Sequence, residues 1–288
     1  MPMKKSAASR LFDSGNAAFL SLLSVISIYP LWREISLSLS SRDEAMRGGL
    51  FLWPREFTWS AYSHIMDSGF IGLAYTNTIF ITAVGTALHL LVTSSAAYAL
   101  AKRTLPWKNA FLLLIVFTMI FSGGLIPTYM AVKQLGLVNS LWAIIALNLS
   151  SGFNLIIMLN FIRAIPEEME ESAMIDGANP IRIYASIILP LCKPVLATLA
   201  LWVAVSLWNN FFQAIIYLND QSLTTLPLLL RQIVAGQEIA QQLGQLDDTT
   251  TESVIAATIV VSILPIVAVY PFLQRYFTKG VMLGSVKS

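Results

Sequence analysis

Long uncharged stretches constrain this chain more than any other feature of its sequence. Six runs contain no Asp, Glu, Lys or Arg: residues 14–32, 68–101, 109–132, 134–162, 194–219 and 253–274. A helix needs ~20 apolar residues to cross the roughly 30 Å hydrocarbon core of a bilayer, and a buried soluble helix rarely runs that long without a charge. Charged residues make up 12% of the 288 residues, which is too few for an ordinary soluble surface. The sequence therefore predicts an all-α integral membrane protein.

The six runs predict six transmembrane helices in a single domain of residues 1–288. The expected spans are residues 16–37, 75–101, 109–126, 141–162, 194–218 and 254–273. The first span follows several basic residues and could be confused with a secretory signal. No small-residue cleavage site closes it, and Pro30, Leu31 and Trp32 prolong it, so we interpret it as a helix of the protein.

Lysine and arginine are distributed unevenly between alternate connecting segments, which predicts the orientation of the chain. One side would hold twelve of them: Lys4, Lys5, Arg10, Lys102, Arg103, Lys108, Arg163, Arg182, Lys193, Arg275, Lys279 and Lys287. The other side would hold six: Arg33, Arg42, Arg47, Arg55, Lys133 and Arg231. Because cytoplasmic segments carry the excess of positive charge, we expect both termini, the connection of residues 163–193 and the tail of residues 274–288 to be cytoplasmic.

Several kinds of chemistry lack the residues that they require. Cys192 is the single cysteine, which excludes an intrachain disulfide or a cysteine-rich metal site. His64 and His89 are far apart in the sequence and lack neighbours of the metal-ligand type, so we expect His89 to be a polar residue that faces a neighbouring helix. No G-x-x-x-x-G-K-[ST] phosphate loop occurs, so the chain is expected to hold no cofactor and to hydrolyse no nucleotide by itself.

The connection between the fourth and fifth spans is too structured for a simple linker. Four carboxylates follow Pro166: Glu167, Glu168, Glu170 and Glu171. Proline needs no donor at a helix start, and carboxylates stabilise the positive end of the helix dipole. Gly177 is expected to end this acidic helix with positive φ.

A second short helix is predicted to follow directly. Asn179 and Pro180 suit its cap and its first residue. Four residues share one face by their spacing of 3, 4 and 7: Ile181, Tyr184, Ala185 and Ile188. Pro190 and Pro194 are expected to stop this helix and to begin the fifth span. Two short helices at an angle, one acidic and one with an apolar face, predict a docking surface.

This connection resembles the hallmark of the permease subunits of binding-protein-dependent ATP-binding-cassette (ABC) importers. The hallmark is E-A-A, three residues, G, nine residues and I-x-L-P. Here it reads Glu171-Ser172-Ala173, then Gly177, then Ile187-Ile188-Leu189-Pro190, with every interval kept and serine in place of one alanine. Serine is nearly as small as alanine, so close packing is expected to survive.

Further stretches narrow the resemblance to the carbohydrate branch of maltose-permease type. They are "FSGGLIPTYM" at 121–130, "LWNNFFQAIIYLND" at 207–220 and the tail "YFTKGVMLGSVKS". Within that branch, "FSGGLIPTY" is most similar to permeases grouped with importers of alginate or other uronic-acid oligosaccharides.

The resemblance implies a type I ABC importer permease fold and a defined assembly in the bacterial inner membrane. The chain would pair with a second, related permease subunit, two cytoplasmic ATPase subunits that bind ATP and Mg²⁺, and an extracytoplasmic sugar-binding protein, and it would bind no nucleic acid. Its cytoplasmic loop would insert into a groove of an ATPase subunit and move the spans as rigid levers. The residues implied in this coupling are Glu170, Glu171, Ser172, Ala173, Asp176, Gly177, Ala178, Ile187, Leu189 and Pro190.

Polar residues of the fifth span are candidates for the sugar path. The candidates are Trp202, Ser206, Asn209, Asn210, Phe212 and Gln213, with Trp208 nearby, and Tyr129 and Asn154 from earlier spans. Amides and hydroxyls can bond sugar hydroxyls, and aromatic rings can stack on the C–H faces of a sugar. The alternative is that these amides bond neighbouring helices, which contributes about 0.6 kcal/mol each on average.

Two other classes of membrane protein remain as alternatives. A secondary carrier or channel would need no ATPase partner, but ion-coupled carriers usually place ionisable groups inside the membrane, and the six uncharged runs contain no Asp, Glu, Lys or Arg. An integral-membrane enzyme would need a cluster of His, Asp or Glu near the membrane surface, and the sequence offers none.

Overall fold

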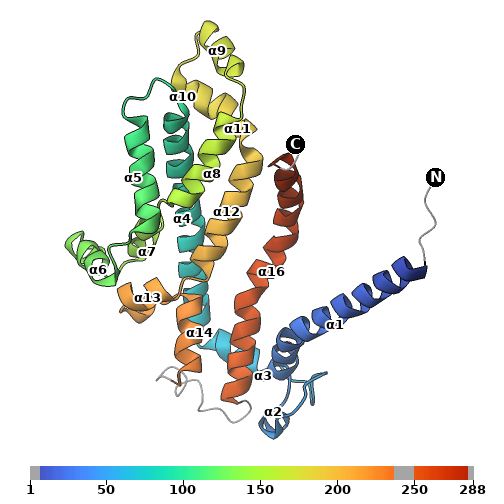
Figure 1. The fold of residues 1–288 in the computed structure, drawn as a ribbon. Helices are drawn as coiled ribbons and strands as arrows, with labels where there is room; N and C mark the ends of the chain where they lie inside the picture. The colour runs from blue at the N-terminus through green and yellow to red at the C-terminus, as the bar shows by residue number, and fades with distance from the viewer. Residues whose placement is uncertain (1–6, 237–249, 285–288) are drawn as a thin grey trace. The chain divides into compact units, whose positions relative to one another are not determined.

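The computed structural model describes residues 7–236 and 250–284, and all regular elements in these ranges are helices (Figure 1). The all-α class expected from the sequence is confirmed. The chain forms two compact units, one of Met1–Phe70 with Gln232–Leu264 and one of Ile71–Arg231 with Pro265–Ser288. By length and composition, three helical segments among the described residues can cross a membrane, namely Leu11–Ser38, Phe70–Ala101 and Thr251–Ala268. Up to six can cross if each of three bent helix pairs counts as one span.

The first unit holds α1 (Ala7–Ser38), α2 (Arg42–Arg47), α3 (Ser60–Asp67) and the first part of α16 (Thr251–Gly284). Its small buried cluster consists of Leu37, Ala45, Phe51 and Ala256. The Ser38 hydroxyl bonds to the Tyr62 hydroxyl across 2.8 Å, and Trp32 Nε1 donates to the Leu52 carbonyl across 2.7 Å. These contacts fix the segment after α1 onto the end of that helix.

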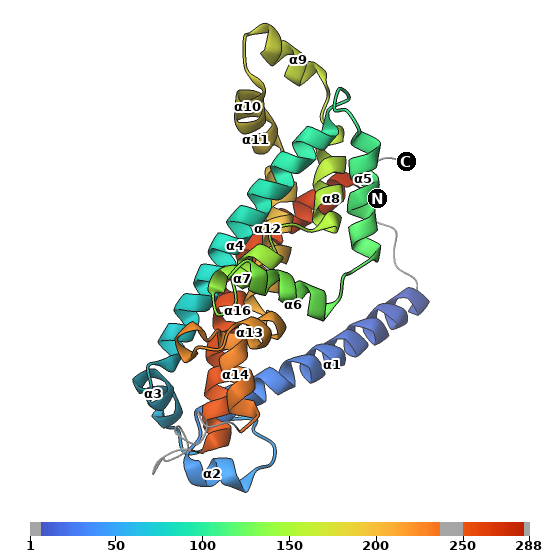
Figure 2. The ribbon, with the colours of Figure 1, turned by 90° about the vertical axis from the view of Figure 1, so that its left-hand side faces the viewer.

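The second unit is built around α4 (Phe70–Ala101). It also contains α5 (Lys108–Ile120), α6 (Leu125–Gln134), α7 (Leu141–Leu147), α8 (Gly152–Arg163), α9 (Glu168–Ile175), α10 (Pro180–Ile183), η1 (Tyr184–Ile188), α11 (Leu189–Leu191), α12 (Lys193–Trp208), α13 (Phe212–Tyr217), η2 (Gln221–Leu223) and most of α14 (Leu226–Val234). α8 packs against α5 and α12, and α7 packs against α13. Figures 1 and 2 both show α4, α8 and α12 side by side.

Three of the expected spans are broken rather than continuous. α5 and α6 meet at 116°, and α7 and α8 meet at 52°, so the spans expected at 109–126 and 141–162 each consist of two helices. The span expected at 194–218 is interrupted between Trp208 and Phe212. The sequences at the breaks are FSGG, NLSS and NNF, and Gly, Ser and Asn favour non-helical backbone. Absence of charge indicated apolar segments but not where the backbone bends.

The remaining expected spans lie within continuous helices. α1 and α4 cover the spans expected at 16–37 and 75–101. α16 covers the span expected at 254–273 and continues to Gly284, so most of the expected tail of residues 274–288 extends this helix. Residues 285–288 lie outside the described residues, as do Lys4, Lys5 and Lys287 of the charge count.

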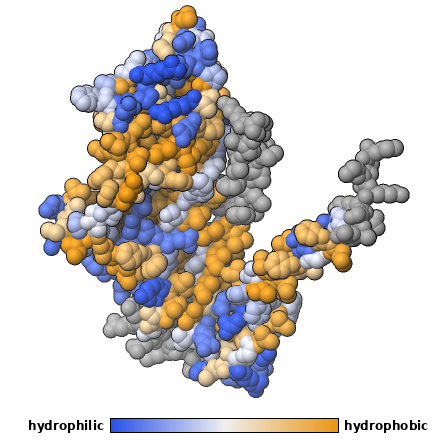
Figure 3. Space-filling view, viewed as in Figure 1, coloured by the Kyte–Doolittle hydropathy of each residue, from blue (hydrophilic) through white to orange (hydrophobic). Residues whose placement is uncertain are grey.

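The buried core of the second unit joins membrane helices to the segment of residues 168–191. One cluster includes Ala97 of α4, Met158 of α8, Ile183 of α10, Ile188 of η1 and Leu199 of α12. Figure 3 shows hydrophilic residues gathered around α9, next to a broad hydrophobic surface over the membrane helices of this unit. The segment is therefore packed onto the ends of these helices.

Candidate functional site

The first candidate site is the docking segment, defined as residues 168–191, and local sequence explains how its first helix ends. Gly177 has φ +81°, and its N–H donates to the Met174 carbonyl across 3.0 Å. The Ala178 N–H donates to the Ala173 carbonyl across 3.0 Å, which completes a Schellman motif. A glycine adopts this backbone without the strain that a Cβ would cause. The predicted end of the acidic helix at Gly177 is confirmed.

The second helix of the docking segment begins as the sequence predicts. The Asn179 side chain accepts a hydrogen bond from the Arg182 N–H across 2.8 Å, and Pro180 is the first residue of α10. The Asn179 carboxamide thus satisfies one of the unpaired donors of the first turn. Pro194 likewise lies in the first turn of α12, as expected for the start of the next helix.

A π-helical turn, η1, decides which face of the second helix is buried. The Leu189 N–H donates to the Tyr184 carbonyl, five residues back. Ile183 and Ile188 are 1% and 0% exposed, whereas Ile181 is 77% exposed. The prediction that Ile181, Tyr184, Ala185 and Ile188 share one face is therefore wrong: Ile181 and Ala185 are exposed, whereas Ile188 is buried. The extra residue in a π turn rotates all later side chains relative to an α-helix.

The prediction that Pro190 stops this helix is also wrong. α11 continues through Pro190 to Leu191, and the helix then bends by 79° into α12. Proline normally clashes with the carbonyl four residues back in an α-helix, and a wider π turn immediately before it relieves that clash.

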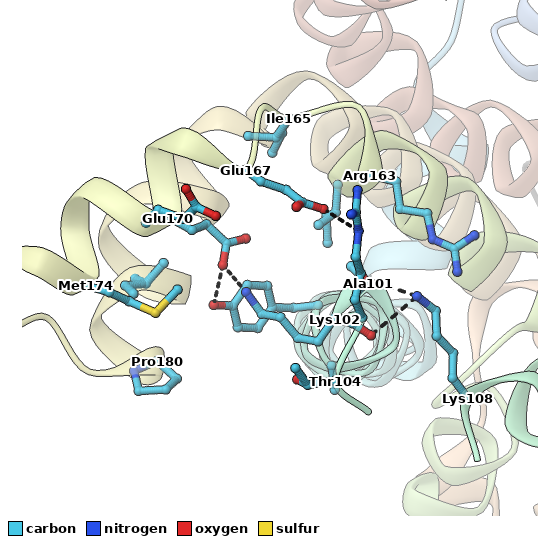
Figure 4. Close-up of a pocket in the computed structure, with 16 residues that line it drawn as sticks. Ala101, Lys102, Thr104, Lys108, Arg163, Ile165, Glu167, Glu170, Met174 and Pro180 are labelled. Carbon is cyan, nitrogen blue, oxygen red and sulfur yellow. Dashed lines mark hydrogen bonds and ion pairs between the residues drawn. The ribbon is translucent and has the colours of Figure 1, made fainter. Parts of the chain in front are cut away.

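An open groove of ≈ 750 Å³ has α9 as one wall. Tyr98 of α4 and Lys102, the residue after α4, hold α9 there through Glu170. Figure 4 shows the Glu170 carboxylate and the Lys102 ammonium pointing toward each other, and they form an ion pair. The Tyr98 hydroxyl donates to the same carboxylate across 3.3 Å, and Lys102 Nζ lies 4.0 Å from the Tyr98 ring centroid. Burial lowers the pKa of Lys102, and the nearby Glu167 carboxylate opposes this shift. Glu170 is thus bonded within its own chain.

The exposed side chains of the docking segment differ from those that the sequence suggested. Glu171 is exposed, in contrast to Glu170. Three apolar side chains are also exposed: Met174 at 53%, Ile175 at 87% and Ile181 at 77%. Of the other residues implied in coupling, Ser172, Asp176, Gly177 and Pro190 are exposed, Ala178, Ile187 and Leu189 are partly buried, and Ala173 is buried. The structure therefore offers a mixed acidic and apolar surface.

The second candidate site is the polar cluster, defined as His89, Asn148, Asn154, Asn210 and Gln213. His89 Nδ1 lies 2.7 Å from the Asn148 carbonyl oxygen, and His89 Nε2 lies 3.0 Å from Asn154 Nδ2. Gln213 Oε1 accepts from Asn148 Nδ2 across 2.6 Å and from Asn210 Nδ2 across 2.7 Å. The cluster ties α4 to the α7–α8 break and to the α12–α13 break. The expectation that His89 faces a neighbouring helix is confirmed.

The structure brings together three of the residues proposed for the sugar path, Asn154, Asn210 and Gln213. The others lie outside the polar cluster: Tyr129, Trp202, Ser206, Asn209 and Phe212. Asn209 Nδ2 donates to the Val205 carbonyl of its own helix across 2.8 Å. The spacing of 3, 4 and 7 does not form one stripe, because α12 ends at Trp208.

Sequence reasoning missed two members of the polar cluster. His89 was assigned no role in the path, and Asn148 was not considered. The available signal was an ionisable side chain and an amide inside uncharged spans, where a polar group needs a partner. Within residues 7–236 and 250–284, no group of three or more His, Cys, Asp or Glu could hold a metal ion.

The chain is similar to known proteins over nearly its whole length. Residues 103–283 match the model of the family described as binding-protein-dependent transport system inner membrane component. Protein LplC of Bacillus subtilis is 42% identical over 99% of this chain and 98% of its own length. The polygalacturonan/rhamnogalacturonan transport system permease protein YtcP of the same organism is 40% identical over 97% and 99%. A chain of a bacterial ABC transporter involved in the import of the acidic polysaccharide alginate matches with a TM-score of 0.89 and 33% identity, over 95% of this chain and 99% of that chain.

Proposed function

The chain belongs to the family of binding-protein-dependent transport system inner membrane components, and on that premise we propose that it is one permease subunit of an ATP-driven oligosaccharide importer. Membership places it in a membrane-bound transport complex with other subunits. The proposed partners are a second permease subunit, two ATPase subunits that bind ATP and Mg²⁺, and an extracytoplasmic sugar-binding protein. Both termini and the docking segment would be cytoplasmic.

The observation that carries this proposal is the docking segment. A surface outside the apolar helices exposes Ile175 at 87% and Ile181 at 77% beside Glu171. Isolated apolar side chains are common on protein surfaces, but two that are this exposed beside a fixed helix end suit a protein partner. The segment is also bonded through Glu170 to Tyr98 of α4 and to Lys102 directly after it, so a force on it would reach the membrane helices. A carrier or channel without an ATPase gives this surface no partner.

The proposed cargo is an acidic oligosaccharide, such as one derived from alginate or polygalacturonan. The support is the similarity to the two transporters whose names include these acidic polysaccharides. The polar cluster fits a sugar through its amide groups, which can bond hydroxyls.

Reconstitution of the complete complex in proteoliposomes tests the transport proposal. We expect uronic-acid oligosaccharides, delivered by the cognate binding protein, to stimulate ATP hydrolysis and to enter the vesicles, whereas maltodextrins should do neither. Uptake that continues without ATP or without the ATPase subunits would overturn the importer assignment. Stimulation by the maltodextrins alone would overturn the acidic cargo and leave the importer intact.

Substitution of the exposed isoleucines tests the docking segment. We expect Ile175→Asp and Ile181→Asp to weaken co-purification of the ATPase at least ten-fold, because a buried charge at an interface core is costly. Thr104→Asp is the matched control: it adds the same charge to an exposed residue of the groove outside the docking segment. Wild-type association of both isoleucine variants would show that the ATPase binds elsewhere.

A further inference from the structure

The hydrogen bonds of His89 determine which form of the ring the polar cluster contains. A carbonyl oxygen can accept but cannot donate, so the 2.7 Å contact with the Asn148 carbonyl requires a proton on His89 Nδ1. The 3.0 Å contact between His89 Nε2 and Asn154 Nδ2 then makes Nε2 an acceptor for the amide. A neutral ring with its proton on Nδ1 satisfies both bonds. Through them the ring orients the backbone at the α7–α8 break and the Asn154 side chain.

The bonds of Gln213 leave one side of its carboxamide available. Its Oε1 accepts two hydrogen bonds, from Asn148 Nδ2 and from Asn210 Nδ2, across 2.6 and 2.7 Å. These two donors use the two lone pairs of the oxygen. The amide nitrogen of Gln213 has no partner among the described residues, so its two N–H groups remain free to donate to a ligand.

The residues of the polar cluster differ in how deeply they are buried. His89 and Asn154 are 3% and 8% exposed, and they lie in the core of the second unit. Asn148, Asn210 and Gln213 are partly exposed. The cluster thus runs from a buried, fully bonded histidine to an accessible amide with unused donors. If the cluster served only to pack helices together, its accessible end would not need amide donors that lack a protein partner.

We propose that His89 is a positioning residue for the cargo: through Asn148 it holds the Gln213 carboxamide so that its free N–H groups bond a hydroxyl of the oligosaccharide during passage. This inference rests on the proposed function as a sugar importer. Asn148 is the link, because its carbonyl accepts from His89 and its side chain donates to Gln213. His89 itself does not touch the cargo.

The test measures sugar taken up per ATP hydrolysed by the reconstituted complex, together with the yield and thermal stability of that complex. We expect His89→Leu and Gln213→Leu each to lower this ratio about five-fold, the effect of one lost hydrogen bond. Because both act through the same amide, the double variant should show no further drop. Hydrolysis stimulated by the loaded binding protein should stay within about two-fold of wild type, since the docking segment is unchanged.

Conservative variants separate positioning from packing. His89→Asn can keep the donor to Asn148, and it should retain more of the ratio than His89→Gln, which can keep the acceptor for Asn154. Asn160→Leu is the matched control for a lost amide: it lies on α8 with Asn154, is exposed, and has no side-chain hydrogen bond among the described residues. This control should keep the wild-type ratio.

Three results would overturn the proposal. A wild-type ratio in His89→Leu would show that the histidine positions nothing in the path, and multiplied losses in the double variant would show that the two residues act independently. If the His89→Leu complex does not assemble, the conservative variants decide. Equal ratios in wild type, His89→Asn and His89→Gln would then show that the histidine positions nothing in the path. Sugar uptake by the wild-type complex without ATP would instead overturn the proposed function as an ATP-driven importer. The ratio of sugar taken up to ATP hydrolysed does not test that function.

Discussion

Gly177 is important for the backbone conformation that it adopts, and not for contacts with neighbouring residues. Its φ of +81° ends α9, yet a Cβ added there would meet no atom of the described residues within 4 Å, apart from its two neighbours in the chain. Any internal cost of a substitution therefore comes from the left-handed backbone, at roughly 1 to 2 kcal/mol. Space around the residue is left for a partner.

Gly136 provides a matched comparison for this position. It has φ +69°, ends α6 with the same pair of bonds, and a Cβ there would also meet nothing within 4 Å. We expect Gly177→Ala and Gly136→Ala to lower the thermal stability of the complex by a similar amount. Only Gly177→Ala should also reduce association with the ATPase, measured by co-purification. Equal association in both variants would remove Gly177 from the interface.

Glu170 and Glu171 illustrate how adjacent residues of like charge take different roles. Both were implied in coupling to a partner, but Glu170 bonds to Lys102 and Tyr98. Glu171 remains exposed and is the carboxylate that a partner can reach. Sequence alone could not separate the two, because Tyr98 and Lys102, which bond to Glu170, lie about seventy residues earlier in the chain.

At the scale of elements, α4 is the helix that touches both candidate sites. His89 joins it to the polar cluster, and Ser94 and Tyr98 join it to the docking segment. The Ser94 hydroxyl lies 2.7 Å from the Tyr184 hydroxyl of η1. A rigid helix with contacts to both sites can carry a displacement of the docking segment toward the cluster.

Two neighbouring serines of α4 allow this link to be tested. Ser94 and Ser95 both donate to backbone carbonyls of their own helix, and Ser94 also bonds to Tyr184. We expect Ser94→Ala to reduce sugar-stimulated ATP hydrolysis about five-fold or more, because it leaves a partly buried tyrosine hydroxyl unpaired. Ser95→Ala should have no effect.

A double-mutant cycle decides whether the bond itself is responsible. Tyr184→Phe removes the other hydroxyl, so Ser94→Ala should cause little additional loss in that background. If the two losses multiply instead, the serine acts through something other than Tyr184.

At the scale of the whole molecule, the orientation across the membrane remains a prediction from charge. Twelve of the eighteen Lys and Arg residues lie on the side assigned to the cytoplasm. Cys192 is the single cysteine and is fully buried, so the native chain should react little with thiol reagents. Introduced cysteines can therefore report the side of the membrane directly.

We expect Ser63→Cys, on the exposed surface of α3, to react with a membrane-impermeant maleimide in intact spheroplasts. Ser172→Cys, exposed in the docking segment, should react after permeabilisation alone. The expected difference follows from the excess of positive charge on the cytoplasmic side. Labelling of Ser172→Cys in sealed spheroplasts would reverse the orientation and exclude a cytoplasmic ATPase as the partner of this segment.

The sequence by itself determined the features that depend on short windows of residues. Uncharged runs identified the apolar helices, because insertion depends on ~20 consecutive residues. Asn179 and Gly177 marked helix ends, since capping bonds join residues a few positions apart. The spacing of the hallmark motif identified the family, which the match over residues 103–283 confirms.

Only the tertiary structure decided the breaks in three spans, the π turn, and the partners of Glu170 and His89. The buried face of residues 180–191 depends on packing against α4 and α8. That packing accommodates a π turn, and a π turn does not follow the 3.6-residue period from which the face was predicted. His89 and Asn154 are 65 residues apart, and Asn148 and Gln213 are also 65 apart. Such pairs meet because folded helices bring them together, and an unpaired polar group in an apolar interior is costly enough to keep them bonded.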